Sequence, residues 1–445
     1  MKSIKTALDQ KLLFWLALAF IVYMPLHVLI VQWFSLATGG IEVWKAAKDV
    51  LIFSTSPLLV YLSYRRGLWS DKNFRMLLIL GGLYASAHGA YLLLDGDDHN
   101  LSTVIATVYN TRLLAYLLLG YIVGSARNGA KYLKYLMTAV VVIAGVVALF
   151  GVAQYFLPPD FLTHFGYSLE RGVKPLFFID DKPEFPRVMS TLKDPNSLGA
   201  YLILPLLAAG WAFADDRVNK GLFVRSFRRS TLAVLASAMF LALLLTFSRG
   251  ALLALIVSLI VWLALTKGQA VWCQVKRFWT LGAVALIILL GIFGVVKDTH
   301  VVQNVVFHAD EATVLADPNE LRVTLFQEAV EDVANRPQGY GPGTAGLVAI
   351  RNPHGGVLTE NYYLQIAYEI GWFGAGLFVG ILAVLVISLY KLRTNYGAVV
   401  LLSSLVGCLF YSLLIHLWSN EALAFQWWLL AGVVLGLAAK KYLTD

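Results

Sequence analysis

The chain has 445 residues, of which 59% are hydrophobic and 14% are charged, and its mean hydropathy is +0.70. A soluble domain is usually about a quarter charged and under half apolar, so this composition excludes a water-soluble globule. It also excludes a disordered chain, because disordered segments are poor in aromatic residues and this chain has 12 Trp, 21 Tyr and 25 Phe. Its two cysteines, Cys273 and Cys408, exclude a disulfide scaffold and a cysteine-ligated zinc site.

Twelve apolar runs are candidates for membrane-spanning helices, which need about 20 predominantly apolar residues. We therefore expect an all-α polytopic membrane protein with about 12 transmembrane helices, organised as a single integral-membrane domain over residues 1–445. No small-residue cleavage site follows the first run, which favours a retained helix over a signal peptide. The runs are 12–36, 43–63, 76–94, 101–123, 133–156, 196–214, 231–247, 250–266, 279–296, 361–390, 395–416 and 421–439.

The basic residues predict how these helices are oriented, because cytoplasmic loops are enriched in Lys and Arg. With the N-terminus in the cytoplasm, 22 of the 35 Lys and Arg residues fall in cytoplasmic segments, and the even number of runs places the C-terminus there too. The net charge of +8 is then mostly a topology signal. It is not the clustered basic face that nucleic-acid binding requires, so no nucleic-acid partner is expected.

Two segments are too long to be simple connections between helices. They are residues 157–195 and residues 297–360, and both fall on the outer face in the predicted orientation. Loops of this length are uncommon unless they are functional. We therefore expect these two outer loops to carry the functional residues.

The first outer loop ends in a helix start that is flanked by cations. Asp194 suits an N-cap and Pro195 the first helical position, and Arg187 and Lys193 come just before them. A helix N-terminus with cations beside it suits an anion. An interfacial anchor, in which Lys and Arg contact lipid headgroups, is equally compatible with the sequence.

A short polar turn, Thr246-Phe247-Ser248-Arg249-Gly250, separates two apolar runs. The turn is so short that Arg249 must lie at or just inside the outer interface. An ionisable residue at this depth is costly, which makes Arg249 a candidate functional residue. Snorkelling of the side chain towards water would also accommodate it.

The second outer loop contains the signature of its own helix. Asp317-Pro318-Asn319-Glu320 predicts a helix start. Leu321, Leu325, Phe326, Ala329 and Val333 follow at helical spacing. This pattern predicts an amphipathic helix on the membrane surface or packed on the bundle, with Arg322 off the apolar stripe. The glycine-rich segment 339–346 then forces tight turns, and its backbone amides could also bind an anion.

The second loop leads into the next span through Glu360-Asn361-Tyr362-Tyr363. Glu360 is expected to cap that helix near the bilayer surface, and His354 precedes it by six residues. A carboxylate or an imidazole that faces the same pocket as the arginines could act as a general base. The structural alternative is a capping Glu and an exposed loop His.

Together these motifs resemble the O-antigen ligase and O-antigen polymerase family of bacterial integral-membrane glycosyltransferases. The similarity covers residues 185–375 and is carried by Arg187 with Ser190-Thr191 and Asp194-Pro195-Asn196, the turn 246–250, Arg322, the segment 339–343, and Glu360-Asn361-Tyr362 with Glu369 and Gly371. The resemblance implies a GT-C-like bundle in the bacterial inner membrane with its active site facing the periplasm. It further implies glycan transfer from undecaprenyl pyrophosphate to an acceptor hydroxyl, with neither a nucleotide sugar nor a metal.

The resemblance also implies roles for individual residues. Family arginines hold the pyrophosphate, which gives this role to Arg187, Arg249 and Arg322, with Lys193 beside them. In the ligases a loop histidine next to Asn acts near the acceptor hydroxyl, but here Glu360 precedes Asn361. Either Glu360 or His354 is therefore the expected base in an inverting reaction.

The resemblance leaves the acceptor open between two kinds of molecule. The lipid A core would make the protein a ligase, and a growing surface polysaccharide would make it a polymerase. The Glu at position 360 favours the polymerase relative to the ligase. A chain-length regulator or a flippase is an expected partner in either case.

Two other classes of membrane protein remain to be compared with an enzyme. A transporter or flippase for lipid-linked glycans is favoured by Arg112 within the fourth run, which could mark a conduction route. The sequence shows no internal repeat of the kind common in transporters, and its charges cluster near the outer face. A membrane scaffold would not need arginines at the outer interface.

Overall fold

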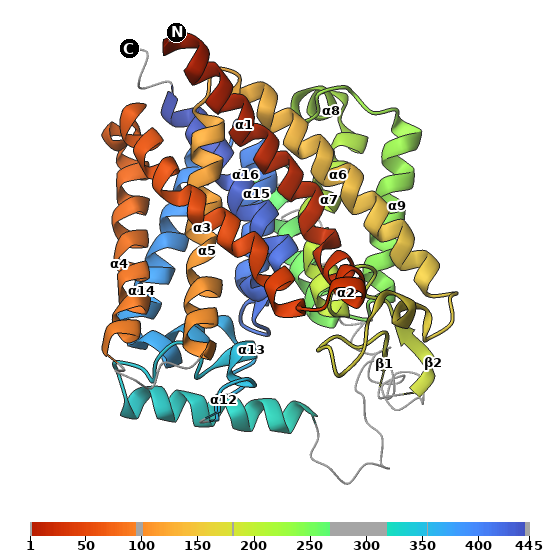
Figure 1. Ribbon diagram of the computed structural model, residues 1–445. Coiled ribbons are helices and arrows are strands. Elements are labelled where there is room, and N and C mark those ends of the chain that lie inside the picture. Colours follow the sequence, from red (N-terminus) through yellow and green to blue (C-terminus); the bar gives the residue numbers. More distant parts are fainter. Residues whose placement is uncertain (1, 95–100, 180–181, 268–317, 354, 441–445) are drawn as a thin grey trace, which may run out of the picture.

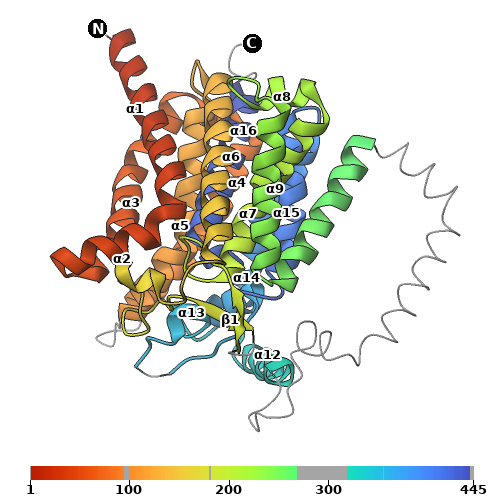
Figure 2. The same ribbon diagram turned by 90° about the vertical axis from the view of Figure 1, so that its right-hand side faces the viewer.

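The computed structural model describes residues 2–94, 101–179, 182–267, 318–353 and 355–440, which form a bundle of long helices with a small β-hairpin (Figures 1 and 2). One further helix spans Arg249–Lys267. The N-terminal elements are α1 (Lys2–Tyr23), η1 (Met24–Leu26), α2 (His27–Thr38), α3 (Ile41–Arg65), η2 (Leu68–Ser70), α4 (Lys72–Leu94), α5 (Leu101–Gly124) and α6 (Gly129–Gln154). The others are η4 (Phe161–Phe165), β1 (Phe177–Ile179), β2 (Lys182–Arg187), α7 (Pro195–Ala214), α8 (Asp216–Leu222), α9 (Arg229–Leu245), α12 (Pro318–Asn335), α13 (Gly346–Ala349), α14 (Tyr362–Lys391), α15 (Tyr396–Tyr411), η6 (Leu417–Ser419) and α16 (Glu421–Lys440).

The predicted apolar runs coincide with helices wherever the structure describes them, and only the run 279–296 lies outside the described residues. Among the described residues, eight helices are long and apolar enough to cross a membrane, and α9 and α15 are shorter apolar helices. This confirms a mostly helical, polytopic membrane protein. The helix α3 is not among the eight, because Glu42, Lys45, Lys48 and Asp49 make its first third polar.

The first predicted span is not a single straight helix. It is divided at η1, where Pro25 lacks the N–H that would continue the α-helical ladder between α1 and α2 (Figure 2). At this break, the carbonyl oxygen of Pro25 accepts a hydrogen bond from Thr191 Oγ1 at 2.6 Å. The break in the first span therefore anchors the end of the first outer loop.

The two ends of the bundle differ in what they carry. The start of α1 and the end of α16 lie at one end, together with α8 (Figure 1). The β1–β2 hairpin, α12 and α13 lie at the other end, where the two long loops meet. This arrangement is the one expected if both termini share one side of the membrane and both long loops share the other.

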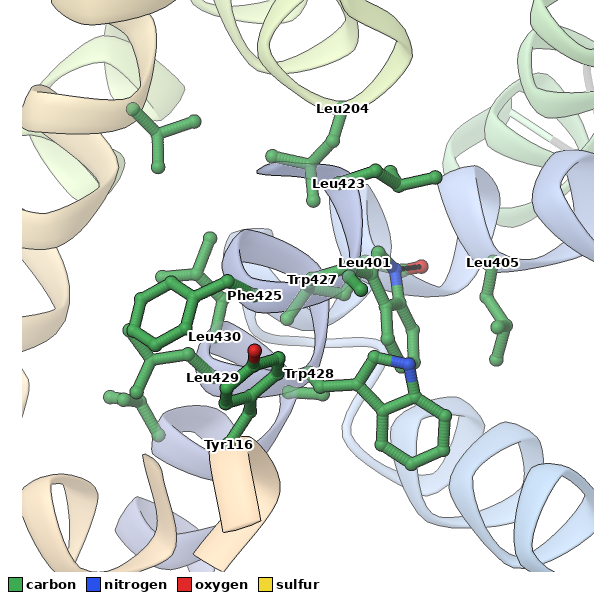
Figure 3. Close-up of a cluster of buried hydrophobic side chains, with 14 of the residues drawn as sticks. Tyr116, Leu204, Leu401, Leu405, Leu423, Phe425, Trp427, Trp428, Leu429 and Leu430 are labelled. Carbon is green, nitrogen blue, oxygen red and sulfur yellow. Dashed lines mark hydrogen bonds between the residues drawn. The ribbon is translucent and has the colours of Figure 1, made fainter. Parts of the chain in front are cut away.

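The centre of the bundle is the contact between α5 and α16, and it depends on glycines that let the two backbones approach closely. A Cβ added at Gly120 would lie 2.1 Å from the carbonyl oxygen of Leu429, and one at Gly432 would lie 2.2 Å from that of Leu117. Small residues four apart are a common way to pack helices in membranes. Around this contact lie the buried rings of Tyr116, Phe425, Trp427 and Trp428 (Figure 3).

In the outer loops, helix α12 agrees with the sequence prediction, whereas the hairpin β1–β2 was not expected. Helix α12 forms where the capping signature predicts it, and Ala329 and Val333 are buried against α14. Phe326, which we expected on the same apolar face, is 45% exposed. The first loop contains the antiparallel pair β1–β2, an exception to the predicted all-α class, because Phe177-Phe178-Ile179 finds a partner strand in Lys182–Arg187.

Candidate functional site

The three sequence motifs of interest are the segment 187–196, the turn 246–250 and the segment 360–362. The first two are joined by hydrogen bonds, although they are far apart in the chain. Arg187 Nε donates to the carbonyl oxygen of Thr246 at 3.0 Å, and Val188 N donates to the carbonyl oxygen of Leu245 at 3.0 Å. Arg187 Nη2 also donates to Asn196 Oδ1 at 3.3 Å. The end of β2, the end of α9 and the start of α7 therefore form one unit, with the Arg187 guanidinium between them.

The second motif is joined to the third through the end of α15. The hydroxyl groups of Ser248 and Tyr411 are 2.8 Å apart. One residue further on, the carbonyl oxygen of Ser412 accepts a hydrogen bond from Tyr362 N at 2.8 Å, at the start of α14. Arg249, directly after Ser248, is exposed and opens the helix Arg249–Lys267. The three sequence motifs thus meet at the same end of the bundle.

Backbone strain marks the same three motifs. Ser190, Phe247 and Glu360 have φ values of 54°, 50° and 47°, and in the described part of the chain they are the non-glycine residues with positive φ. This left-handed region is unfavourable for residues other than glycine. Such strain is retained where the surrounding structure imposes it, which is often at functional sites. One strained residue falls in each of the three motifs.

The residue that caps α14 is Asn361, and the prediction that Glu360 caps it is wrong. Asn361 Oδ1 accepts a hydrogen bond from Leu364 N at 3.0 Å, and Asn361 Nδ2 donates to the carbonyl oxygen of Leu413 at 3.2 Å. Glu360 lies one residue before the cap, in the strained turn, and is partly exposed. Because the amide caps the helix, the Glu360 carboxylate is not used for capping.

The capping prediction at α7 is confirmed. Asp194 Oδ1 accepts from Ser197 N at 2.8 Å, and Asp194 Oδ2 accepts from the Ser197 hydroxyl at 2.7 Å. Lys193, just before this cap, lies beside His416, a residue that the sequence analysis did not single out. Burial, with a smaller contribution from the charge of Lys193, lowers the pKa of His416 from 6.5 to about 4. His416 Nε2 lies 3.1 Å from Thr359 Oγ1, so a neutral imidazole contacts the residue before Glu360.

The glycine-rich loop is docked on a kink in α14. Gly341 N donates to the carbonyl oxygen of Glu369 at 2.8 Å, and Gly343 N donates to Glu369 Oε1 at 2.9 Å. The kink lies at Ile370 and Gly371, where the backbone leaves the helical conformation. These two amides therefore bind acceptors within the protein, and the loop acts here as a structural turn that holds the outer loop against α14.

A cavity of about 550 Å³ opens between η1, α2, α3, α5, the start of α16 and the outer loops. Among the predicted site residues that the structure describes, Lys193 lines this cavity, whereas Arg187, Arg249 and Glu360 are not part of its wall. Three more cations, Lys45, Lys174 and Arg351, line it as well. The cavity thus adjoins the joined motifs through Lys193 and carries an excess of positive charge on its wall.

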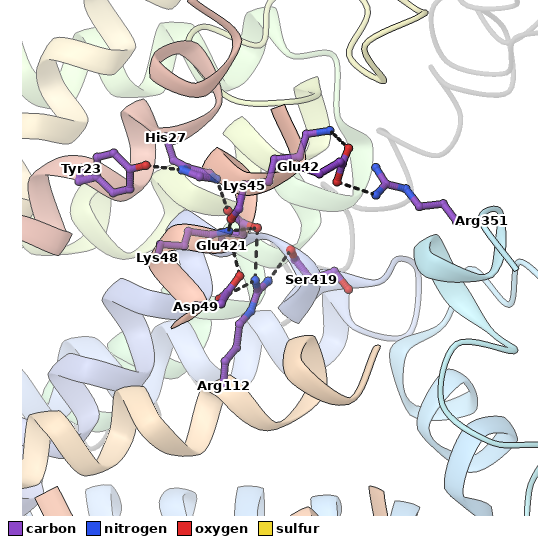
Figure 4. Close-up of polar contacts among 10 residues, drawn as sticks. All are labelled: Tyr23, His27, Glu42, Lys45, Lys48, Asp49, Arg112, Arg351, Ser419 and Glu421. Carbon is purple, nitrogen blue, oxygen red and sulfur yellow. Dashed lines mark hydrogen bonds and ion pairs between the residues drawn. The ribbon is translucent and has the colours of Figure 1, made fainter. Parts of the chain in front are cut away.

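A network of buried ion pairs (Figure 4) reaches this cavity through Glu421 and His27. Glu421, at the start of α16, contacts Lys48 at 3.1 Å, Arg112 at 3.2 Å and His27 at 3.3 Å. Asp49 contacts the same two cations, Lys48 at 3.0 Å and Arg112 at 3.6 Å. Arg112, whose position in a span favoured a conduction route, is fully buried and paired with these carboxylates.

Two predicted site residues remain, and the structure describes the backbone of one and nothing of the other. Arg322 belongs to α12 by its backbone, and His354 lies outside the described residues. The contacts above join the segments that carry Arg187, Arg249 and Glu360, and Lys193 of the first segment lines the cavity. Within the ranges that the structure describes, no group of three or more His, Cys, Asp or Glu side chains is arranged to hold a metal ion.

Comparison with known families gives one match. Residues 234–379 match the family model described as O-antigen ligase. The matched segment runs from α9 into α14, and it includes the Arg249 turn, α12, the glycine-rich loop and Glu360. A search of curated proteins found no match to the chain. The family match supports the predicted family over residues 234–379 and, in general terms, glycan transfer of the O-antigen ligase type by a membrane enzyme.

Proposed function

We propose that this protein is a bacterial inner-membrane glycosyltransferase that moves a glycan from undecaprenyl pyrophosphate to an acceptor hydroxyl at the periplasmic face. The observation that carries the proposal is that hydrogen bonds link three segments at one end of the bundle, and that these segments carry Arg187, Arg249 and Glu360. Two guanidinium groups and a carboxylate are the groups that such a transfer needs.

The arginines act on the leaving group. Departure of the lipid diphosphate builds negative charge on its oxygens, and planar guanidinium groups pair well with phosphate. Arg187 is fixed by its bonds to Thr246 and Asn196, so its charge is positioned before the reaction begins. Preorganised charges of this kind stabilise a transition state more than mobile ones do. Arg322 and Lys193 complete the diphosphate site in this proposal.

Glu360 acts on the acceptor. Its carboxylate would take the proton from the acceptor hydroxyl as that oxygen attacks the anomeric carbon, and the bond from this carbon to the diphosphate oxygen would break on the opposite face, which inverts the configuration. The release of Glu360 from a capping role supports this assignment, because Asn361 supplies the cap. His354 is the competing base. The charge neutralisation is assigned to the arginines, without a metal.

The substrates are a glycan on undecaprenyl pyrophosphate and an acceptor that is either the lipid A core or a growing polysaccharide. In this proposal the GT-C-like bundle places the lipid tail between helices in the membrane, and the outer loops enclose the glycan. Both termini lie in the cytoplasm, and a chain-length regulator or a flippase works beside the enzyme.

A flippase for lipid-linked glycans is the second candidate function. It is favoured by the buried ion pairs of Arg112, Lys48, Asp49 and Glu421, since ionisable residues inside a membrane bundle often mark a transport route. The two candidates differ in their product. A flippase moves the lipid-linked glycan unchanged, whereas a transferase releases the lipid diphosphate.

The test uses the purified protein in lipid nanodiscs, with lipid-linked glycan extracted from the membranes of the source cells as the donor and the cell's own glycan acceptors added. The proposal predicts elongated or newly attached glycan in the absence of any nucleotide sugar and in the presence of a chelator. A donor pool that stays chemically intact, combined with its translocation across vesicles containing the protein, would establish the flippase instead.

A further inference from the structure

Glu421 (Figure 4) is a carboxylate that the proposed reaction does not use. It lines the 550 Å³ cavity. Its side chain is 20% exposed, whereas those of Lys48 and Arg112 are 1% and 0% exposed. The cations therefore lie behind the carboxylate, and the carboxylate faces the cavity.

The contacts of Glu421 leave part of its hydrogen-bonding capacity for a ligand. Glu421 Oε1 contacts both Lys48 Nζ and Arg112 Nη1, and Glu421 Oε2 contacts His27 Nε2. His27 is held in turn by Tyr23, whose hydroxyl lies 2.8 Å from His27 Nδ1. A carboxylate offers about four acceptor sites, so these three contacts within the described residues leave room for one more donor from the cavity.

The rest of the cavity wall suits a carbohydrate. The ring of Tyr109 lines it and is fixed against the Arg112 guanidinium, at 4.2 Å from the ring centroid. Phe177 adds a second aromatic side chain. The volume falls within the range of about 300–1,000 Å³ that is usual for small-molecule sites. Apolar rings with a few fixed polar groups are the general composition of such sites.

We propose that the cavity is a sugar-binding site, in which Glu421 accepts a hydrogen bond from a hydroxyl group of the glycan. The proposal rests on the proposed glycan transfer for the identity of the ligand. The sugar belongs to the donor or to the acceptor, and Lys193 at the cavity wall places it next to the diphosphate site. Lys48, Arg112 and His27 hold the carboxylate in one orientation.

The competing explanation is that Glu421 only neutralises the buried cations. Asp49 provides the matched control, because it contacts the same Lys48 and Arg112 but is not part of the described cavity wall. Glu421→Gln and Asp49→Asn each remove one negative charge from this network. In Glu421→Gln the amide oxygen is drawn to the two cations, which turns the NH₂ group towards His27 and the cavity and removes the open acceptor.

The experiment measures binding without turnover. The probe is the free oligosaccharide released by mild acid from the extracted lipid-linked glycan, and saturation-transfer NMR detects its contact with the protein in nanodiscs. We expect Glu421→Gln to weaken binding roughly tenfold or more, the range for a hydrogen bond to a charged group. Asp49→Asn should bind like the wild type, and both variants should lose thermal stability to a similar extent.

Two outcomes would overturn the proposal. Wild-type binding by Glu421→Gln would show that the carboxylate does not contact the sugar, and equal loss of binding by both variants would show that its role is structural. If Glu421→Gln is not recovered folded, Glu421→Asp answers the same question, because it keeps the charge but withdraws the oxygens from the cavity by one methylene group.

The same experiment distinguishes failure of the sugar-binding proposal from failure of the proposed glycan transfer. Binding of the oligosaccharide that depends on Glu421, without any transfer by the wild type, would contradict the transferase and leave the sugar site standing. Where transfer occurs, a raised KM for the lipid donor in Glu421→Gln assigns the sugar to the donor, and a raised KM for the acceptor assigns it to the acceptor.

Discussion

Arg187 and Thr246 are 59 residues apart in the chain, and the Arg187 Nε donates to the Thr246 carbonyl oxygen at 3.0 Å. This bond fixes the guanidinium at the end of the first outer loop against the turn that presents Arg249. The Arg187 guanidinium is thereby held beside the backbone of the turn that carries Arg249. In the proposed function, this bond would hold the Arg187 guanidinium in place before the lipid diphosphate binds.

The kink of α14 gives a test of how the glycine-rich loop is held. Gly371 has φ of +71°, and a Cβ there would lie 2.2 Å from the carbonyl oxygen of Pro337. We expect Gly371→Ala to lower the free energy of unfolding by roughly 1–3 kcal/mol. Gly376→Ala in the same helix, where a Cβ would meet nothing within 4 Å, is the control and should be neutral or stabilising. Similar unfolding midpoints for the two variants would contradict the docking described here.

The general base can be assigned by comparing two variants. We expect Glu360→Gln to reduce transfer by roughly 100-fold, the usual scale of general-base catalysis, and His354→Ala to reduce it less. The Gln side chain keeps the shape of Glu while losing its charge, so the loss reports on the carboxylate. Glu331→Gln, at an exposed position of α12, is the control. A fully active Glu360→Gln together with an inactive His354→Ala would reverse the assignment.

His416 predicts a pH dependence of stability. Its pKa is about 4 in the folded protein and about 6.5 in an unfolded chain, so between these values the unfolded state binds more protons. The stabilising contribution of the neutral imidazole is complete above pH 6.5. It is lost as the pH falls towards 4, at up to about 1.4 kcal/mol per pH unit.

The measurement compares thermal unfolding of the wild type and His416→Gln in detergent between pH 7 and pH 4.5. The variant should lose less stability on acidification than the wild type does. Parallel curves for the two proteins would mean that His416 does not enter the folded state as the neutral imidazole.

The membrane helices were predictable because each depends on a local run of apolar residues. The charged residues of the first third of α3 show the limit of that reasoning, since Lys48 and Asp49 find their partners on α5 and α16. Those partners are far away in the sequence, so the ion network around Glu421 has no local signal. The same holds for His416, whose position beside Thr359 follows from the packing of α14 and α15.

The sequence predicted which segments carry the candidate site residues, but it predicted less well how their side chains are arranged. The cap at Asp194 is a local pattern, and it is confirmed. At the start of α14 two adjacent residues, Glu360 and Asn361, could each cap the helix, and the choice depends on the contact of Asn361 with Leu413. The hairpin β1–β2 was missed because Lys182–Arg187 contains two prolines and no alternation of apolar residues.

The orientation in the membrane can be tested by labelling single cysteines in a Cys273→Ser, Cys408→Ala background. Glu184→Cys in β2 and Lys220→Cys in α8 are exposed and lie at opposite ends of the bundle (Figure 1). We expect an impermeant reagent added to intact spheroplasts to label position 184 and not position 220. Labelling of position 220 alone would invert the topology.

The most direct test of the proposed function is the stoichiometry of transfer by the wild type and by Arg249→Ala and Arg187→Ala, with Arg217→Ala of α8 as the control. Mass spectrometry follows both the released undecaprenyl pyrophosphate and the glycan product. We expect the wild type and the control to release one lipid diphosphate per glycan transferred. Arg249→Ala and Arg187→Ala should each lower the rate of transfer roughly 100-fold or more at normal protein levels. Replacing either arginine by Lys should restore little of the rate. Near-normal transfer by both Ala variants would contradict the account.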